Sequence, residues 1–253
     1  FDEPFTRLFN QGTVISGGQK MSKSRGNVIA PDDYVKTLGA DTVRTYLMFI
    51  GPWEQGGDWN DQGIRGMHRW FNRIWSAVLD KYETAETNDD KTKDLRRVMH
   101  QTIRRVHDDL ERFHFNTMLA ALMEYTNYLG KAREERAVSV ESFAEATRTL
   151  MLLLAPTAPH LAEELWQRTG NPYSIHSQPF PQWDDKLAAD ENFTLVIQVN
   201  GKLRDKVDVP VKITANDARE LVMCREKVKE HLKGADPVKV IYVPGKLINI
   251  VVK

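Results

Sequence analysis

Between residues 61 and 169, apolar side chains recur every three or four positions, which places them on one face of an α-helix. The spacing predicts a long helix through residues 64–78, followed by helices over about 91–113, 116–132 and 140–154. A fifth helix is expected after Thr157, with Pro159 in its first turn and Gly170 at its end. Because the connections are short, neighbouring helices should run antiparallel, so this region is predicted to form a helix bundle.

After residue 192 the pattern changes to that of strands. Strands are expected over 194–199 and 203–209, joined by a tight Asn200-Gly201 hairpin turn. A helix capped by Asn216 and ending near Leu232 should follow, and then strands over 238–243 and 247–252. The order ββαββ predicts a small α+β domain. The fold class is therefore mainly α, a helix bundle with a small α+β C-terminal domain.

The first 60 residues predict a strand near Val14, a helix over 31–38, and a second helix that Asp41 caps and that ends near Ile50. Residues 56–60 (GGDWN) are typical of a turn-rich connector.

Composition excludes several classes of protein. No apolar run approaches the roughly 18 residues of a membrane span, so no membrane partner is expected. A single cysteine excludes an internal disulfide framework and a multi-cysteine zinc site, and no metal site is predicted. Cys224 fits an apolar helical stripe with Leu221 and Val228, which favours a place in the core. These features suit a reducing cytoplasm.

Charge is distributed unevenly although the formal net charge is zero. Residues 193–253 carry 12 Lys and Arg against 7 Asp and Glu, a net of +5. A basic terminal domain indicates a partner that carries phosphate.

Residues 17–27 (GGQKMSKSRGN) have the composition of an anion-binding loop. Glycines at both ends allow the backbone to approach a ligand closely, and the lysines and serines between them offer cations and hydrogen-bond donors. That inventory suits a polyphosphate, although the order of a Walker P-loop is absent. The alternative is a solvated surface loop.

The run KMSKS at 20–24, with RGNVI at 25–29 and GADTVR at 39–44, resembles the signature region of class I aminoacyl-tRNA synthetases. The resemblance implies that the loop binds ATP, with Mg²⁺ in the full enzyme. It implies catalytic roles for Lys20 and Lys23, with Lys23 as the direct phosphate ligand. The ATP-binding residues that it implies are Lys20, Met21, Ser22, Lys23 and Ser24.

The C-terminal segments 196–206 (VIQVNGKLRDK) and 243–252 (VPGKLINIVV) are similar to the C-terminal domain of bacterial leucyl-tRNA synthetases. The resemblance covers the whole chain, as the C-terminal part of such an enzyme. It implies tRNA(Leu) and ATP as partners, leucine bound by domains outside this chain, and a monomer. A valine or isoleucine enzyme with an unusual tail is the alternative.

The same resemblance divides the chain into three parts. Residues 1–60 would be the KMSKS-loop segment and connector of the catalytic domain, 61–185 a helical domain of the anticodon-binding type, and 186–253 a small tRNA-binding domain. No H-x-G-H motif occurs among the seven histidines, so the other half of the ATP site is expected outside this chain. We therefore expect the chain to be inactive alone. In the rival interpretation it is only an RNA-binding module whose loop is disordered.

Candidate tRNA contacts follow from the spacing of cations. Lys202, Arg204 and Lys206 alternate along the return strand of the hairpin, so they should share one face and follow a phosphate backbone. The alternative is a solvated outer face. Two helical stripes of cations are also expected in the bundle, and at least one should be an ion-paired surface. The stripes are Arg65, Arg69 and Arg73, and Arg97, His100, Arg104 and His107. His160, at a helix start, is predicted to be structural.

Overall fold

The computed structural model of the chain describes residues 2–232 and 234–252, and it separates into two compact units, residues 1–188 and 189–253. Each unit has a hydrophobic core of its own.

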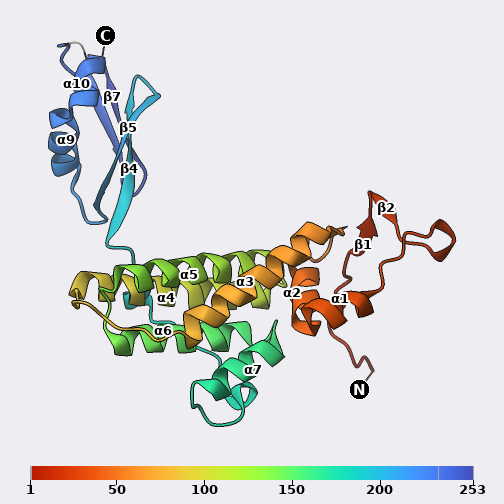
Figure 1. Ribbon diagram of the computed structural model, residues 1–253. Helices are drawn as coiled ribbons and strands as arrows, with labels where there is room; N and C mark the ends of the chain where they lie inside the picture. The colour runs from red at the N-terminus through yellow and green to blue at the C-terminus, as the bar shows by residue number, and fades with distance from the viewer. Residues whose placement is uncertain (1, 233, 253) are drawn as a thin grey trace. The chain divides into compact units, whose positions relative to one another are not determined.

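Five helices build the bundle of the first unit (Figure 1). They are α3 (Asp61–Leu79), α4 (Asp89–Glu111), α5 (Phe115–Glu135), α6 (Val140–Leu154) and α7 (Pro159–Arg168). Their predicted apolar faces meet in one core, where Trp70, Tyr125 and Trp166 are fully buried. Side-chain caps mark where the helices begin, because Asn60 accepts from Gln62 and Gly63 at the start of α3, and Ser139 accepts from Ser142 at the start of α6.

The predicted bundle is therefore confirmed. The chain leaves it through a short 3₁₀ turn, η2 (Ile175–Ser177), and one further helical turn, α8 (Asp185–Ala188).

Two short helices and a small sheet precede the bundle within the first unit. The helices are α1 (Pro31–Leu38) and α2 (Ala40–Phe49), and the sheet has the order β2-β1-β3. Its strands are β1 (Thr13–Ser16), β2 (Gln19–Lys20) and β3 (Gly56–Asp58). The expectation of a mere connector at 56–60 was wrong, because β3 pairs in parallel with β1. A Cβ atom at Gly56 would lie 2.2 Å from the carbonyl oxygen of Thr13, so this pairing needs glycine.

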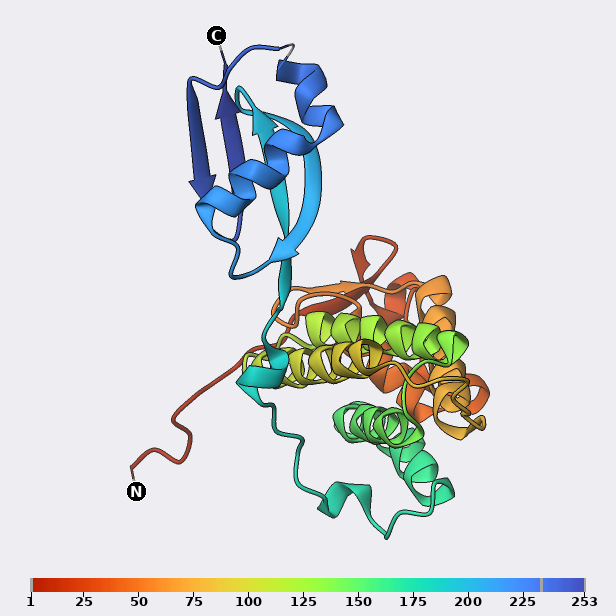
Figure 2. The ribbon, with the colours of Figure 1, turned by 90° about the vertical axis from the view of Figure 1, so that its left-hand side faces the viewer.

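The second unit is a four-stranded sheet with two helices on one face (Figure 2). The sheet order is β5-β4-β7-β6, and β4 (Asn192–Val199) pairs antiparallel with β5 (Lys202–Pro210) and parallel with β7 (Leu247–Val251). β6 (Lys239–Val243) pairs antiparallel with β7 at the edge. Alternate residues of the strands, such as Leu195 and Ile197, are fully buried beneath the helices.

The helical segment of this unit differs from the prediction. It consists of α9 (Ala215–Cys224) and α10 (Glu226–Leu232), because Arg225 between them has an extended backbone. Thr214, and not Asn216, caps α9 by accepting from the backbone N–H of Asp217. The break also turns Cys224 outward, so the cysteine is exposed and its predicted place in the core was wrong.

Among the described residues, no helix is both long enough and apolar enough to cross a membrane.

Candidate functional site

The loop at 17–27 is a hairpin followed by a 3₁₀ turn. Gly17 and Gly18 have φ of 60° and 72°, which a two-residue hairpin turn requires, and they join β1 to β2. The chain then makes one 3₁₀ turn, η1 (Lys23–Arg25), and leaves it at Gly26, where φ is 68°. Glycine is needed at these turns because other residues adopt such angles at a cost.

One asparagine holds the two halves of the loop together. The Oδ1 atom of Asn27 accepts from the backbone N–H of Ser22 at 2.8 Å, and its Nδ2 donates to the carbonyl oxygen of Lys20 at 3.3 Å. The hydroxyl groups of Ser22 and Ser24 lie 2.8 Å apart and share a hydrogen bond. Asn27 therefore fixes the backbone on both sides of Met21, which is half-buried.

Asp58 on β3 anchors the tip of the hairpin, because its Oδ2 accepts from the backbone N–H of Gly18 at 2.8 Å. Trp59 extends this anchor by donating its own backbone N–H to Ile15 at 2.9 Å. The loop is thus tied to the segment that leads into the bundle, 40 positions away in the sequence.

The cations of the loop face solvent. Lys20, Lys23 and Arg25 are exposed, and within the part of the chain that the structure describes none of them forms an ion pair with a carboxylate. Three unneutralised cations next to the paired hydroxyl groups of Ser22 and Ser24 can bind an anion with several oxygens.

A small polar cluster supports the segment between the loop and the bundle. Asp61 accepts from the Tyr34 hydroxyl at 2.5 Å and from the Trp59 indole at 2.9 Å. The Tyr34 hydrogen bond, followed by that from Trp59, lowers the pKa of Asp61, and the same carboxylate raises the pKa of Tyr34. The carboxylate is therefore ionised and orients α1 against the start of α3.

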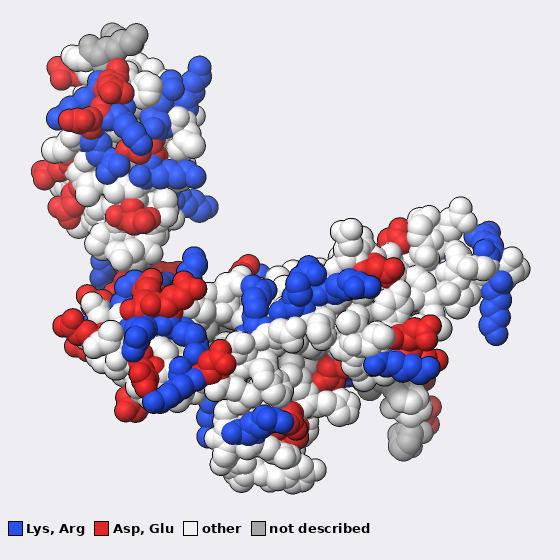
Figure 3. Space-filling model, viewed as in Figure 1, with Lys and Arg blue, Asp and Glu red and all other residues white. Residues whose placement is uncertain are grey.

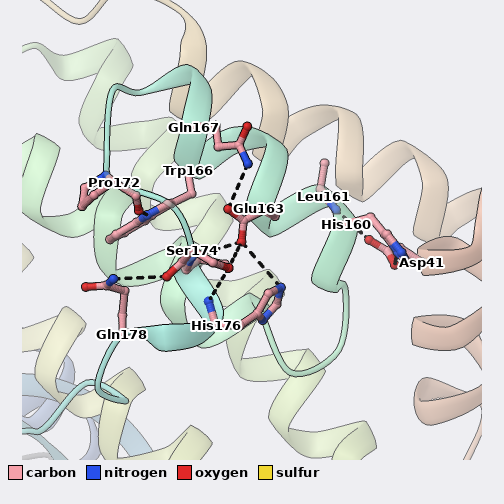
Figure 4. A network of polar contacts seen from close by, with 11 residues as sticks. Asp41, His160, Leu161, Glu163, Trp166, Gln167, Pro172, Ser174, His176 and Gln178 are labelled. Carbon is pink, nitrogen blue, oxygen red and sulfur yellow. Dashed lines mark hydrogen bonds and ion pairs between the residues drawn. The ribbon is translucent and has the colours of Figure 1, made fainter.

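Asp41 was expected to cap α2, but it lies inside that helix and caps α7 instead (Figure 4). Its buried carboxylate accepts from the backbone N–H of Leu161 at 2.7 Å and lies 2.8 Å from the Nδ1 atom of His160. The backbone N–H groups at a helix start lack partners within the helix, and a carboxylate satisfies them well. His160 lies beside this cap with its ring exposed, and its structural role stays a prediction.

Glu163 on the same helix fixes the chain beyond it, as Figure 4 shows. It accepts from the hydroxyl of Ser174 and from the backbone N–H of Ile175. The Ser174 contact is the largest cause that lowers the pKa of Glu163. The indole of Trp166 donates to the carbonyl of Pro172 at 2.8 Å. These contacts hold residues 172–178 against α7 and serve packing.

The hairpin cations of the second unit do not share one face. Lys202 pairs with Val199, whose side chain points into the core, whereas Lys206 pairs with Val196 on the other face of the sheet. The register shifts between Ile197 and Gln198, so Arg204 is an extra residue on β5 and the alternation is broken there. All three cations are exposed. A β-bulge has no signal in the spacing of charges, which is why the single-face expectation was wrong.

Comparison with known proteins places the chain in a family. Residues 92–219, half of the chain, match the model of the anticodon-binding domain of tRNA ligase. This chain belongs to that tRNA ligase family. Residues 1–58 match the model of class I tRNA synthetases for isoleucine, leucine, methionine and valine.

Relatives that this tRNA ligase chain resembles carry the name leucine–tRNA ligase. That of Dehalococcoides mccartyi is 53% identical over 253 residues, all of this chain and 31% of the relative. Those of Rubrobacter xylanophilus and Deinococcus radiodurans are 49% and 42% identical over 100% and 99% of the chain. The predicted resemblance to leucyl-tRNA synthetases is thereby confirmed. The chain spans about a third of the length of these relatives.

A solved structure agrees with the sequence comparison. A crystal structure of the ternary complex of LeuRS, tRNA and LeuAMS from Agrobacterium radiobacter K84 matches this chain. The LeuRS superposes on this chain with a TM-score of 0.82 and is 35% identical to it. The match covers 100% of this chain and 34% of that one. The predicted fold class, a helical domain of the anticodon-binding type with a small α+β domain, is confirmed.

Sequence reasoning missed the residues that hold the loop in place. Asn27 belongs to the quoted motif but received no role, although its amide bridges both sides of Met21. Asp58 was treated as part of a turn, because its contact depends on the pairing of β1 with β3. The two glycines and the acid in this run favour a turn, so the local sequence carried no signal of that strand.

Proposed function

We propose that this chain is the part of a leucine–tRNA ligase that supplies the ATP phosphate loop and the surfaces that bind tRNA(Leu). The observation that carries this proposal is the loop at 17–27, whose exposed cations are presented by a backbone that Asn27 and Asp58 fix. The identities of 42–53% to leucine–tRNA ligases support leucine as the amino acid.

The reaction has two steps. In the first, a leucine carboxylate oxygen attacks the α-phosphorus of ATP, a bond forms between them, and the bond to the β-phosphate breaks as pyrophosphate leaves. In the second, a terminal ribose hydroxyl of tRNA attacks the leucyl carbonyl and AMP leaves. Negative charge builds on the departing phosphates in the first step, so cations aimed there stabilise the transition state more than the ground state.

Lys23 would contact the phosphates directly and Lys20 would assist it. Ser22 and Ser24, whose hydroxyl groups are bonded to each other, would support the loop or donate to ATP. Met21, which is half-buried, would pack under the loop. A fixed backbone matters here, because donors that are already in place lose little entropy when charge develops.

Magnesium would enter with ATP. Its preferred ligands are carboxylate and phosphate oxygens, and within the described residues no group of three or more His, Cys, Asp or Glu gathers to hold a metal. Asp58 contacts the loop, but one of its carboxylate oxygens already accepts a hydrogen bond from the backbone N–H of Gly18. We therefore assign no magnesium ligand among the described residues, and the proposed contribution of the loop comes from its lysines and serines.

The second unit would contribute Lys202, Arg204 and Lys206 to tRNA binding. Lys202 and Lys206 lie on opposite faces of the sheet, and Arg204 lies at the bulge of β5. Three further points stay predictions: the division into three functional parts, a monomeric state and a cytoplasmic location. The boundaries of those parts are 1–60, 61–185 and 186–253.

The lysine assignment is testable by pyrophosphate exchange in the full-length ligase that contains this chain. Lys23→Gln should lower kcat by about 10²–10³-fold, because it removes one donor to the transition state. Lys36→Gln, which removes an exposed lysine from neighbouring α1, is the matched control and should leave the rate unchanged. An unchanged kcat in Lys23→Gln would refute the role of the loop in catalysis.

A further inference from the structure

Four aromatic rings from three separate segments of the first unit meet in one cluster. Phe9 stacks on Phe113, with ring centroids 4.7 Å apart and an interplanar angle of 19°. Phe115, at the start of α5, contacts Phe113 and Trp53 edge to face, with centroids 5.6 and 5.1 Å away. Stacked and edge-to-face pairs of rings stabilise a structure beyond the area that they bury. These four residues, the aromatic cluster, therefore join the turn between α4 and α5 to the segments near Phe9 and Trp53.

Phe113 occupies a backbone position that normally belongs to glycine. It follows α4, and its φ of 58° lies in the left-handed region. The backbone N–H of His114 donates to the carbonyl of Asp109 at 2.8 Å, and that of Phe113 donates to Leu110 at 3.2 Å. This pair of bonds is a Schellman motif, in which glycine is the usual residue because a Cβ atom makes the left-handed angle costly.

The end of α7 has the same hydrogen-bonding pattern with the usual residue. Gly170 has a φ of 79°, its backbone N–H donates to Gln167 at 2.9 Å, and that of Asn171 donates to Trp166 at 3.2 Å. The backbone alone would therefore favour glycine at position 113 as well. A side chain that is kept in a strained conformation indicates a role for that side chain. The ring of Phe113 supplies one, because it stacks in the aromatic cluster although the residue is 36% exposed.

The aromatic cluster lies where two strands of the small sheet begin. Phe9 comes shortly before β1, and Trp53 comes shortly before β3. The backbone N–H of Gly12 donates to the carbonyl of Trp53 at 2.7 Å, which joins the two segments. They pack backbone against backbone, because a Cβ atom at Gly12 would lie 2.0 Å from the backbone nitrogen of Gly56. The cluster thus fastens the start of β1 and β3 to the turn between α4 and α5.

The other ends of the same two strands hold the signature loop. β1 leads directly into the turn at Gly17 and Gly18, and Asp58 at the end of β3 accepts from the backbone N–H of Gly18. Figure 3 shows the cations of the loop projecting from the end of the first unit, away from the bundle. A shift of the sheet at the aromatic cluster would therefore displace these cations, and a displacement of about 1 Å is enough to slow a catalysed step substantially.

We propose that the aromatic cluster aims the signature loop, and that Phe113 is a positioning residue for the activation of the amino acid. This inference rests on the proposed function and adds to it a contribution of the bundle to the first chemical step. Phe113 acts through its neighbours and does not touch the substrate. Its ring holds the start of β1, and the strand sets the direction in which Lys20 and Lys23 meet the departing phosphates.

Pyrophosphate exchange by the full-length ligase that contains this chain tests the proposal. Phe113→Gly should lower kcat about threefold to tenfold with little change in the KM for ATP, because the cations matter most as charge develops in the transition state. The same variant should keep its Tm within about 2 °C of the unaltered protein, since relief of the left-handed strain offsets the lost ring packing. Phe113→Tyr retains the stacked ring and should restore kcat.

Two further variants separate positioning from folding. Phe9→Leu should lower kcat as Phe113→Gly does, and the double variant should be no slower than either single variant, because both changes remove the same contact. The matched control is Phe143→Leu, which removes a ring that stacks on Tyr82 at 4.0 Å elsewhere in the bundle. This control should lower the Tm and leave kcat unchanged.

Hydrogen exchange in the chain itself gives a readout that does not depend on activity. In Phe113→Gly the backbone amides of β1 and β2 should exchange faster, while those of α3 should keep their rates.

An unchanged kcat in Phe113→Gly would overturn the proposal, and so would an equal loss of kcat in Phe143→Leu. If the unaltered ligase catalyses no leucine-dependent exchange, the proposed function itself fails. If it does, and Lys23→Gln is slow whereas Phe113→Gly is not, the aromatic cluster alone is wrong.

Discussion

At the scale of single residues, a few polar contacts decide how the chain presents its cations. Asn27 bridges both sides of the signature loop, and Arg225 breaks the helical segment of the second unit to reach Asp205. The Asp205 carboxylate is buried and accepts from the Arg225 guanidinium at 2.6 Å and from the backbone N–H of Lys206. A buried carboxylate needs such partners.

The contact between Arg225 and Asp205 should make the stability of the second unit depend on pH. Hydrogen bonding from Arg225 is the largest cause that lowers the pKa of Asp205 below its usual 3.8. The contact therefore stabilises the fold fully above about pH 4, and the contribution is lost as pH falls through the lowered pKa. Arg225→Ala should reduce the free energy of unfolding at pH 7 by roughly 1–3 kcal/mol.

Thermal unfolding at pH 7 and pH 3 measures this dependence. The difference between Arg225→Ala and the unaltered chain should shrink at the lower pH. Arg219→Ala, which removes an exposed arginine from α9, should change little at either pH. An equal loss at both pH values would mean that Arg225 acts through packing alone.

At the scale of elements, the bundle was predictable and its connections were not. Apolar periodicity located α3 through α7, because a helix in a bundle must bury one face. β3, the bulge at Arg204 and the break at Arg225 depend on contacts between distant segments, for which local pattern carries little signal. Within the candidate site, the loop motif could be recognised from the sequence alone. The role of Asp58 as its anchor could be found only from the structure.

The start of α7 shows the same dependence on a distant residue. Asp41, on α2, satisfies the backbone N–H of Leu161. Asp41→Ala should lower the free energy of unfolding by about 1 kcal/mol, because a helix start loses its acceptor. Asp41→Asn keeps an oxygen acceptor and should cost less. Urea denaturation followed by circular dichroism would measure both, and equal losses would show that the hydrogen bond to Leu161 is not the cause.

At the scale of the whole molecule, the chain combines two units with separate cores and different charge. The first unit carries the signature loop and the bundle, and the second carries the basic hairpin. Both match parts of tRNA ligases, and a LeuRS bound to tRNA has the same fold over the entire chain. The central claim of the proposed function is that these units recognise leucine-accepting tRNA specifically and do not only bind phosphates.

The measurement that tests this claim most directly is binding of the chain to leucine-, valine- and isoleucine-accepting tRNAs across a salt series. Contacts to phosphates alone weaken steeply with salt and do not distinguish the three. We predict a preference for the leucine-accepting tRNA that persists as salt is raised. Equal affinities with the same steep salt dependence would contradict the claim and leave the chain as a general phosphate-binding surface.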